Sequence, residues 1–160
     1  MAITIAKTAA ITAGAFNSWW VKNVTLNANN LNVAFVPYNG EYALSTTPSR
    51  VNIDVAAKKT SDSTFATVIN AFNTEIQRQY TVKNPSPAVT SFVVPNLNIM
   101  AQNPDRQVTL FVNLVVNGAN KTLMIVDIYD AASKDATFNT ALTNFINELG
   151  RQGKAAGKID

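Results

Sequence analysis

Cysteine and histidine are both missing from this chain of 160 residues. Without cysteine, the chain has no disulfide, no thiol nucleophile and no thiolate metal ligand. Without histidine, it lacks the commonest general base and the commonest metal ligand. The two absences remove the side chains on which many hydrolytic and metal-dependent active sites are built.

Charged residues are also scarce. They make up 14% of the chain, whereas about a quarter is usual for a globular protein. The 13 basic residues only slightly outnumber the 10 acidic ones, and no run of five like charges occurs. Such a small excess provides little attraction for nucleic-acid phosphates. We expect a neutral, polar surface on which charge repulsion does little to keep copies of the chain apart.

Glycine-rich loops and long apolar runs are missing too. The six glycines are scattered and form neither GxGxxG nor GxxxxGK[ST], so no phosphate-binding loop is expected. No stretch approaches the roughly 18 apolar residues of a membrane span. The N-terminal segment MAITIAKTAAITAGAF is interrupted by Lys7 and by threonines, so we expect neither a signal peptide nor a membrane anchor.

What the chain does contain is a long internal repeat. The stretch TFATVINAFNTEIQRQ (64–79) recurs 73 positions later as TFNTALTNFINELGRQ (137–152). Each copy has four apolar residues at spacings of 4, 3 and 4, which is typical of one face of an amphipathic helix. These residues are Phe65, Ile69, Phe72 and Ile76 in the first copy, and Phe138, Leu142, Phe145 and Leu149 in the second.

Three segments of alternating apolar residues precede each predicted helix and indicate three strands. The dipeptides at 29–30, 39–40 and 117–118 (Asn-Asn, Asn-Gly and Asn-Gly) are typical hairpin turns between them. The strand faces match between the copies at an offset of 73, or of 77 for the second strand. The matched sets are Val24, Leu26 and Ala28 with Leu97, Ile99 and Ala101; Leu31, Val33 and Phe35 with Val108, Leu110 and Val112; and Val51, Ile53 and Val55 with Met124, Val126 and Ile128.

Charged residues recur at the ends of the predicted helices. Asp62 and Asp135 lie just ahead of them, where a carboxylate can cap the helix or interact with its dipole. Glu75 and Arg78 form an i,i+3 pair that we place in the last turn of the first helix, and the same pair recurs 73 residues later.

These patterns predict an α+β fold built as a tandem duplication of a β-β-β-α unit with internal pseudo-twofold symmetry. Two arrangements remain open: one mainly antiparallel six-stranded sheet with both helices on one face, or two half-sheets about a pseudo-twofold axis. Gly150 and Gly153 weaken the end of the second helix, and the residues beyond should fray. We expect a single domain (1–160) with an N-terminal arm (1–18), two repeats (19–80 and 92–152) and a flexible basic tail (153–160).

The sharpest candidates for chemistry are matched carboxylates, Asp54 with Asp127 and Glu75 with Glu148. Paired carboxylates can share a proton or bind a divalent cation. We favour the simpler interpretation of strand-end and helix-end charges reproduced by the duplication, because no serine-centred elbow or metal-spaced cluster accompanies them. We therefore expect no enzyme, no catalytic residue, no metal and no cofactor.

An aromatic cluster, Phe-Asn-Ser-Trp-Trp (16–20), lies just ahead of the first predicted strand. Adjacent tryptophans cannot both face the same side of a strand. One of them is therefore either an exposed anchor for a protein partner or packed against the N-terminal arm while the other caps the core. The candidate interface residues are Phe16, Trp19, Trp20, Tyr38, Arg151, Lys154 and Lys158.

The chain resembles virion structural proteins of tailed bacteriophages. The resemblance is carried by the opening MAITI, the Phe-Asn-x-Trp-Trp cluster, the phrase FVPYNGEYAL (35–44), the Asn/Thr/Ala bias and the lack of Cys and His. It covers about half of the chain and names no specific family. It implies a structural subunit, either a head decoration (cement) protein or a tail or baseplate component.

The resemblance also implies partners and a location. The partners would be major capsid or tail proteins and further copies of the chain, in a homo-oligomer or multi-copy array, and the chain would reside in a virion assembled in the host cytoplasm. The alternative is a small nucleic-acid-binding module that uses the basic tail and the exposed aromatic residues. No membrane partner is expected.

Overall fold

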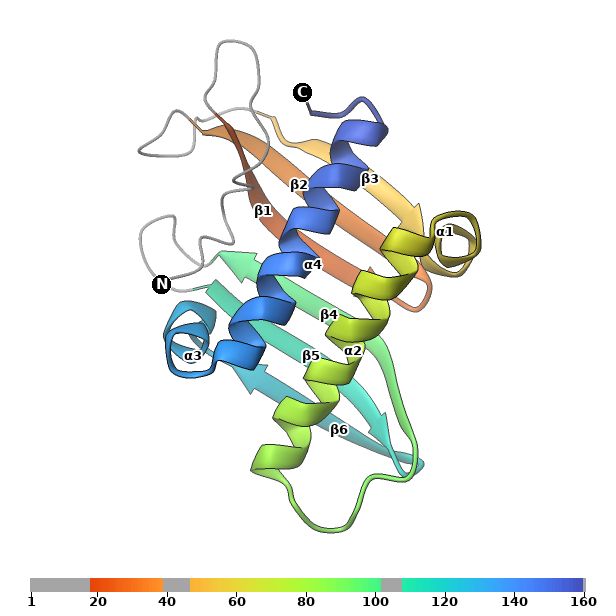
Figure 1. Cartoon of the computed structure of the whole chain (residues 1–160), viewed down its shortest axis with the longest axis vertical. Coiled ribbons are helices and arrows are strands. Elements are labelled where there is room, and N and C mark those ends of the chain that lie inside the picture. Colours follow the sequence, from red (N-terminus) through yellow and green to blue (C-terminus); the bar gives the residue numbers. More distant parts are fainter. Residues whose placement is uncertain (1–17, 39–46, 102–107, 160) are drawn as a thin grey trace.

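The strands form one six-stranded antiparallel sheet in the order β3-β2-β1-β4-β5-β6. This computed structural model describes residues 18–38, 47–101 and 108–159. The first of the two arrangements is therefore the one adopted, with an α+β fold (Figure 1). The strands are β1 (Ser18–Asn27), β2 (Asn30–Tyr38), β3 (Ser49–Asp54), β4 (Phe92–Ala101), β5 (Val108–Val116) and β6 (Ala119–Ile125).

Four helices occur in the described residues, and the two long ones lie antiparallel across the same face of the sheet (Figure 1). The helices are α1 (Val55–Ser61), α2 (Ser63–Lys83), α3 (Ile128–Lys134) and α4 (Ala136–Ala155). All eight apolar residues predicted for the two helix faces are buried. The rings of Phe72 and Phe145 stack where α2 crosses α4, with centroids 4.1 Å apart and planes 4° from parallel.

The predicted helix caps are confirmed. The Asp62 carboxylate accepts a hydrogen bond from the backbone N–H of Phe65, and the Asp135 carboxylate accepts one from the N–H of Phe138. The short helices α1 and α3 were not predicted, and they replace the ends of the third strands. Val55 and Ile128, expected as strand residues, are instead the first residues of these helices.

The predicted register of β6 was wrong by one residue. Leu123 and Ile125 face the helices and are buried, whereas Met124 and Val126, expected in the core, are 50% and 54% exposed. One cause is spacing: the last buried residue of β3, Ile53, lies two positions before α1, whereas Ile125 of β6 lies three positions before α3. Because side chains alternate along a strand, this slip turns Met124 to the opposite face.

Two smaller predictions also shift. Leu31 pairs with Leu26 in the hairpin of β1 and β2, and Leu110 pairs with Ile99 in that of β4 and β5, so the second strands match at an offset of 79 rather than 77. The first hairpin turn is Ala28-Asn29, one residue earlier than predicted. The turn at Asn117-Gly118 is confirmed, and both residues have positive φ as such a turn requires. The pair at 39–40 lies outside the described residues.

The repeated Glu and Arg residues were predicted to be end-of-helix charges. They instead join the two long helices. Glu75 and Glu148 are buried, 5% and 4% exposed. Arg78 binds Glu75 within α2 and also Asp135 at the start of α4, with an Nη2–Oδ2 distance of 2.6 Å. We call this network the first clasp; Gln79 completes it by donating to both carboxylates.

The same network recurs at the other end of the helix pair. Arg151 binds Glu148 within α4 and the Asp62 carboxylate at the start of α2, at 2.8 and 2.9 Å. Gln152 donates to Asp62 at 3.1 Å. We call this network the second clasp. With both clasps in place, each buried glutamate is paired with an arginine, which avoids the cost of an unpaired buried charge.

The segment 153–160, predicted as a flexible basic tail, contacts the rest of the fold over its described part. Helix α4 continues to Ala155, and Ile159 is buried against the core. Gly153 is buried in close contact with Phe35, and the N–H of Lys158 donates to its carbonyl oxygen. The hydroxyl of Ser49 on β3 donates to the carbonyl oxygen of Lys158. The end of α4 is therefore held against β2 and β3.

We predict that removing the charges of Asp62 and Asp135 makes the Tm of the protein less sensitive to low pH. The N–H of Phe65, followed by the Arg151 guanidinium, lowers the pKa of Asp62 to about 2, and Arg78, followed by the N–H of Phe138, lowers the pKa of Asp135. Their stabilisation is complete above the ordinary Asp pKa of about 3.9 and is lost as the pH falls toward 2. The double variant Asp62→Asn/Asp135→Asn keeps capping groups but should have a lower Tm at pH 7 and a flatter Tm profile from pH 5 to 2.

Circular dichroism melts across this pH range measure the effect. Asp130→Asn is the matched control, since Asp130 forms an exposed i,i+4 pair with Lys134 and should leave the profile nearly unchanged. A double variant as acid-sensitive as the wild type would contradict the role of the clasps.

We predict that Gly153→Ala destabilises the protein by about 1–3 kcal/mol, although alanine normally favours a helix by up to about 1 kcal/mol over glycine. A Cβ at this position would lie 2.8 Å from Cε2 and 2.9 Å from Cζ of Phe35. Urea unfolding measures the loss. Phe35→Leu/Gly153→Ala should cost less than the sum of the single changes, because the smaller side chain relieves the overlap. A Gly153→Ala variant more stable than the wild type would rule out the close contact.

Candidate functional site

The matched carboxylates do not come together as a reactive pair. Asp54 ends β3 and Asp127 follows β6, at opposite edges of the sheet, and five strand spacings separate these edges by about 24 Å. Each carboxylate instead caps a short helix: Asp54 accepts from the N–H of Ala57, which lowers the pKa of Asp54, and Asp127 accepts from the N–H of Tyr129. Within residues 18–38, 47–101 and 108–159, no three acidic side chains are grouped as a metal site requires.

Of the candidate interface residues, the structure describes the side chains of Trp19, Arg151, Lys154 and Lys158. Trp19 lies within β1, not ahead of it, and packs half-buried against the core. Trp20 and Tyr38 lie in β1 and β2, but their side chains are outside the described parts of the chain, as is the whole of Phe16. Their role as interface residues therefore remains a prediction.

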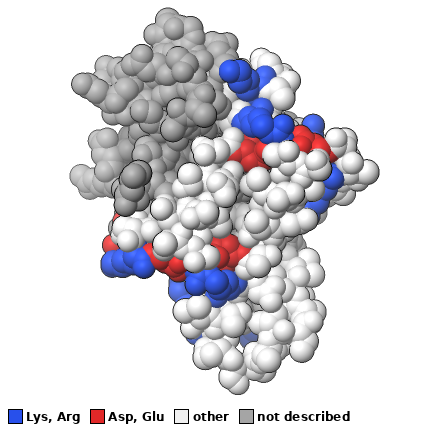
Figure 2. Space-filling view, in the orientation of Figure 1, with Lys and Arg blue, Asp and Glu red and all other residues white. Residues whose placement is uncertain are grey.

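The three basic candidates lie at the C-terminal end of α4. The Arg151 guanidinium is committed to the second clasp, whereas Lys154 and Lys158 are exposed. Figure 2 shows the helix side of the molecule, on which charged side chains gather in groups and much of the remaining surface is neutral. Most of the basic and acidic groups in these clusters are close to one another, so they present no extended field of one sign.

The sheet face opposite α2 and α4 is a further candidate surface of the described residues. We call it the open face and define it by side chains that alternate with the buried ones along the strands. Those side chains are Thr25, Asn32, Arg50, Asn52, Asn96, Asn98, Met100, Phe111, Asn113, Thr122 and Met124. Amides and hydroxyls dominate the set, and one charged side chain, Arg50 at the β3 edge, belongs to it.

An apolar patch lies at the β4-β5-β6 side of the open face. Phe111 lies directly opposite Met124 in the sheet, and Met100 is its diagonal neighbour. These three side chains are 37%, 50% and 39% exposed, and the nearby Val126 is 54% exposed. Four large apolar side chains on adjacent strands are typical of an interaction surface rather than of scattered surface residues.

The amide part of the open face is ordered by hydrogen bonds between strands. Asn32 donates from Nδ2 to Oδ1 of Asn52 at 2.6 Å, and Arg50 donates to Oδ1 of Asn32 at 3.3 Å. Near the middle of the sheet, Oδ1 of Asn98 is buried without a hydrogen-bond partner. A buried amide oxygen without a donor is costly, and this one is too buried for a second chain to reach without a rearrangement.

The open face does not extend over the whole sheet. Ala34 and Val36 lie on the same side of β2 but are buried, 0% and 5% exposed. The accessible part therefore covers β4, β5 and β6 and the adjoining ends of β1, β2 and β3.

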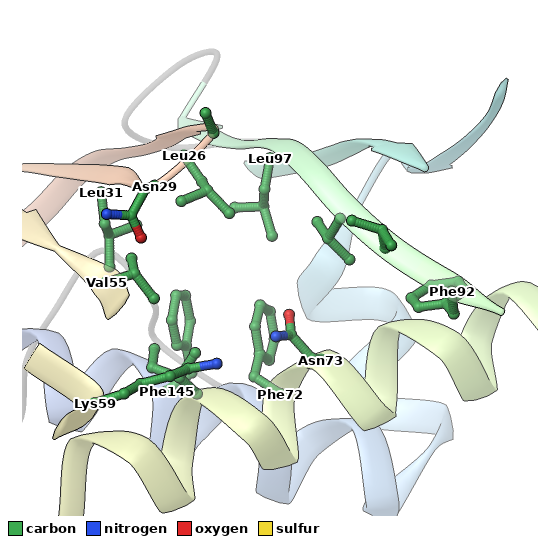
Figure 3. A pocket seen from close by; sticks show the side chains of 14 residues that line it. Leu26, Asn29, Leu31, Val55, Lys59, Phe72, Asn73, Phe92, Leu97 and Phe145 are labelled. Atoms are coloured by element: carbon green, nitrogen blue, oxygen red, sulfur yellow. The ribbon is translucent and has the colours of Figure 1, made fainter. Parts of the chain in front are cut away.

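The opposite side of the sheet holds a cavity of about 280 Å³ between the strands and α2. Figure 3 shows Leu26 and Leu97 pointing from the strands toward the rings of Phe72 and Phe145. Three polar side chains also line this cavity: Asn29 from the first hairpin, Lys59 from α1 and Asn73 from α2. The cavity is therefore apolar with a few polar groups, which is the usual composition of a small-molecule site.

Neither surface was identified from the sequence. The open-face patch was missed because Met124 and Val126 had been assigned to the core. The cavity was missed because Lys59 and Asn73 belong to no motif. The one signal available was a mismatch between the repeats, since Ala132 and Ile146 occupy these two positions in the second copy.

In the described residues, no helix is long and apolar enough to cross a membrane.

Comparison with known proteins identifies no relative. No protein-family model, no curated protein and no solved structure matches this chain. The function must therefore be inferred from the open face, the cavity and the resemblance described above.

Proposed function

We propose that this chain is a non-enzymatic structural subunit that assembles in many copies. Because its sequence resembles virion structural proteins, we propose a bacteriophage particle as the place of assembly. The observation that carries the proposal is the open face, a sheet surface with neutral amides, hydroxyls and an apolar patch. Its first partner is a second copy of the chain, joined face to face. Capsid or tail proteins would bind the assembled subunits in a head decoration, tail or baseplate role.

The chemistry of the open face supports pairing with an identical surface. An amide both donates and accepts hydrogen bonds, so the side chains around Asn98 can bond to the same residues of a second copy. A face with Arg50 as the charged side chain of its defined set meets little like-charge repulsion from its copy. The patch of Met100, Phe111 and Met124 supplies the apolar area that interface centres contain.

The size of the open face fits a weak contact. Six strands about 4.8 Å apart, with five residues each rising about 3.3 Å, would form a face on the order of 500 Å², and the accessible part is smaller because Ala34 and Val36 are buried. Two such faces together stay below the roughly 1,000 Å² of a standard specific interface, so each contact is weak. A contact of this size suits an assembly in which many subunits each add a modest interaction.

The nucleic-acid alternative has less support. It relies on exposed aromatic residues and on the basic tail, but Trp19 is half-buried, Arg151 is paired with acidic residues and the end of α4 packs on the sheet. Lys154 and Lys158 alone offer few phosphate contacts.

We also propose that the fold is a tandem duplication with a pseudo-twofold axis through the centre of the sheet. The register of β1 and β4 supports it: Thr25 lies opposite Asn98, its counterpart 73 residues later, and Asn23 lies opposite Met100, the counterpart of Asn27. The clasps also exchange under this offset, since Arg78–Asp135 corresponds to Arg151–Asp62. Phe72 stacks on its own counterpart, Phe145.

We predict that Phe111→Glu/Met124→Glu abolishes self-association without unfolding the protein. The wild type should show a concentration-dependent increase in mass from micromolar to near-millimolar chain in sedimentation-velocity centrifugation. Two carboxylates on each face would repel those of the second copy and remove its apolar contact.

Val82→Glu is the matched control, because Val82 is 67% exposed but belongs to α2. It should associate like the wild type. A wild type that remains monomeric throughout, or a double variant that associates normally, would refute assembly through the open face. Association abolished by Val82→Glu would assign the contact to the helix side.

A further inference from the structure

The two halves of the fold differ at one place in the core, and the difference creates the cavity. Val55 and Ile128 each follow a capping aspartate as the first residue of a short helix. Lys59 and Ala132 are each the fifth residue of these helices. Ile128 and Ala132 are buried, 0% and 3% exposed, whereas no residue of α1 is buried.

The long helices show the same difference. Asn73 follows Phe72 on α2, and Ile146 follows Phe145 on α4. Ile146 is 2% exposed and belongs to the core, while Asn73 is half-buried and lines the cavity. The second half fills its core with Ala132 and Ile146, and the first half places a cation and an amide at the matching positions.

Polar residues in place of core residues weaken the packing, so their presence requires a compensating role. The Asn29 side chain is already committed, because it donates to Asp54 and accepts from the N–H of Ala56. The side chains of Lys59 and Asn73 make no hydrogen bond or ion pair with any part of the described chain. They are thus available to a ligand inside the cavity.

We propose that this cavity binds a small apolar molecule bearing one carboxylate, such as a medium-chain fatty acid. Leu26, Leu97, Phe72 and Phe145 would contact the apolar body (Figure 3). The Lys59 ammonium would pair with the carboxylate, and the Asn73 amide would donate a hydrogen bond to it. The volume of about 280 Å³ lies near the lower limit of small-molecule sites, about 300 Å³, and so selects a short chain.

The cation distinguishes this ligand class from uncharged apolar molecules. A carboxylate of this kind is ionised at pH 7 and gains a charge-assisted contact that an alcohol of equal length does not. The binding site lies on the helix side of the sheet, so this proposal is independent of assembly through the open face.

The test is titration of the full chain with octanoate and with 1-octanol, followed by isothermal calorimetry and by NMR of methyl groups. The wild type should bind octanoate saturably, with shifts at Leu26, Ile69 and Leu97. Lys59→Met keeps most of the apolar stem and removes the charge. It should weaken octanoate by roughly tenfold or more and leave the affinity for octanol within about twofold.

A second variant, Asn73→Phe/Leu26→Phe, places larger apolar side chains in the lining and should reduce the cavity volume. It should bind both molecules more weakly while keeping the wild-type circular dichroism spectrum. The open-face variant Phe111→Glu/Met124→Glu should bind octanoate like the wild type, which separates this site from the assembly surface.

Three results would overturn the proposal: octanoate shifts that do not saturate or that spread over the surface, an octanoate affinity unchanged by Lys59→Met, or full octanoate affinity retained by a folded Asn73→Phe/Leu26→Phe variant. Equal losses for octanoate and octanol in Lys59→Met would also overturn it, because they would show that the cation makes no specific contact.

Discussion

The fold depends on the two clasps that hold α2 against α4. Each links an arginine to a buried glutamate of its own helix and to the aspartate that caps the other helix. Each long helix is tied to its own three strands through a short helix only a few residues long. Fixing the helices side by side therefore also brings β1 against β4, and two three-stranded units become one sheet over a shared core. The Phe72–Phe145 stack occupies the centre of this arrangement.

The helices and their caps could be predicted from the sequence because their signals are local. A 3.6-residue period identified all eight buried helix-face residues, and an aspartate just before each helix identified its cap. The clasps could not be predicted in the same way. The i,i+3 pair of Glu75 and Arg78 is visible in the sequence, but the contact of Arg78 with Asp135 spans 57 positions and exists only because the helices pack antiparallel.

The third strand of the second unit shows where the periodicity argument is insufficient. Residues 123–126 read Leu-Met-Ile-Val, so both faces of this strand are apolar and alternation cannot select the buried one. Alignment to Val51 and Ile53 chose the wrong face because one more residue separates the last buried strand residue from the short helix in the second unit. The same residues that made the sequence ambiguous, Met124 and Val126, form part of the apolar patch. An exposed apolar surface thus removes the alternation that would identify the buried face.

Most of the acidic side chains form contacts inside the fold rather than on its open face. Four of the ten acidic residues, Asp62, Glu75, Asp135 and Glu148, belong to the clasps, and Asp54 and Asp127 cap the short helices. A chain with few charges that commits most of its carboxylates to internal contacts leaves an amide-rich sheet face whose defined set contains one charged side chain, Arg50. Such a face is poorly protected against self-association. The few charges of the chain are thus used mainly between the two long helices. The open face is left mostly neutral, which suits contact with a second copy.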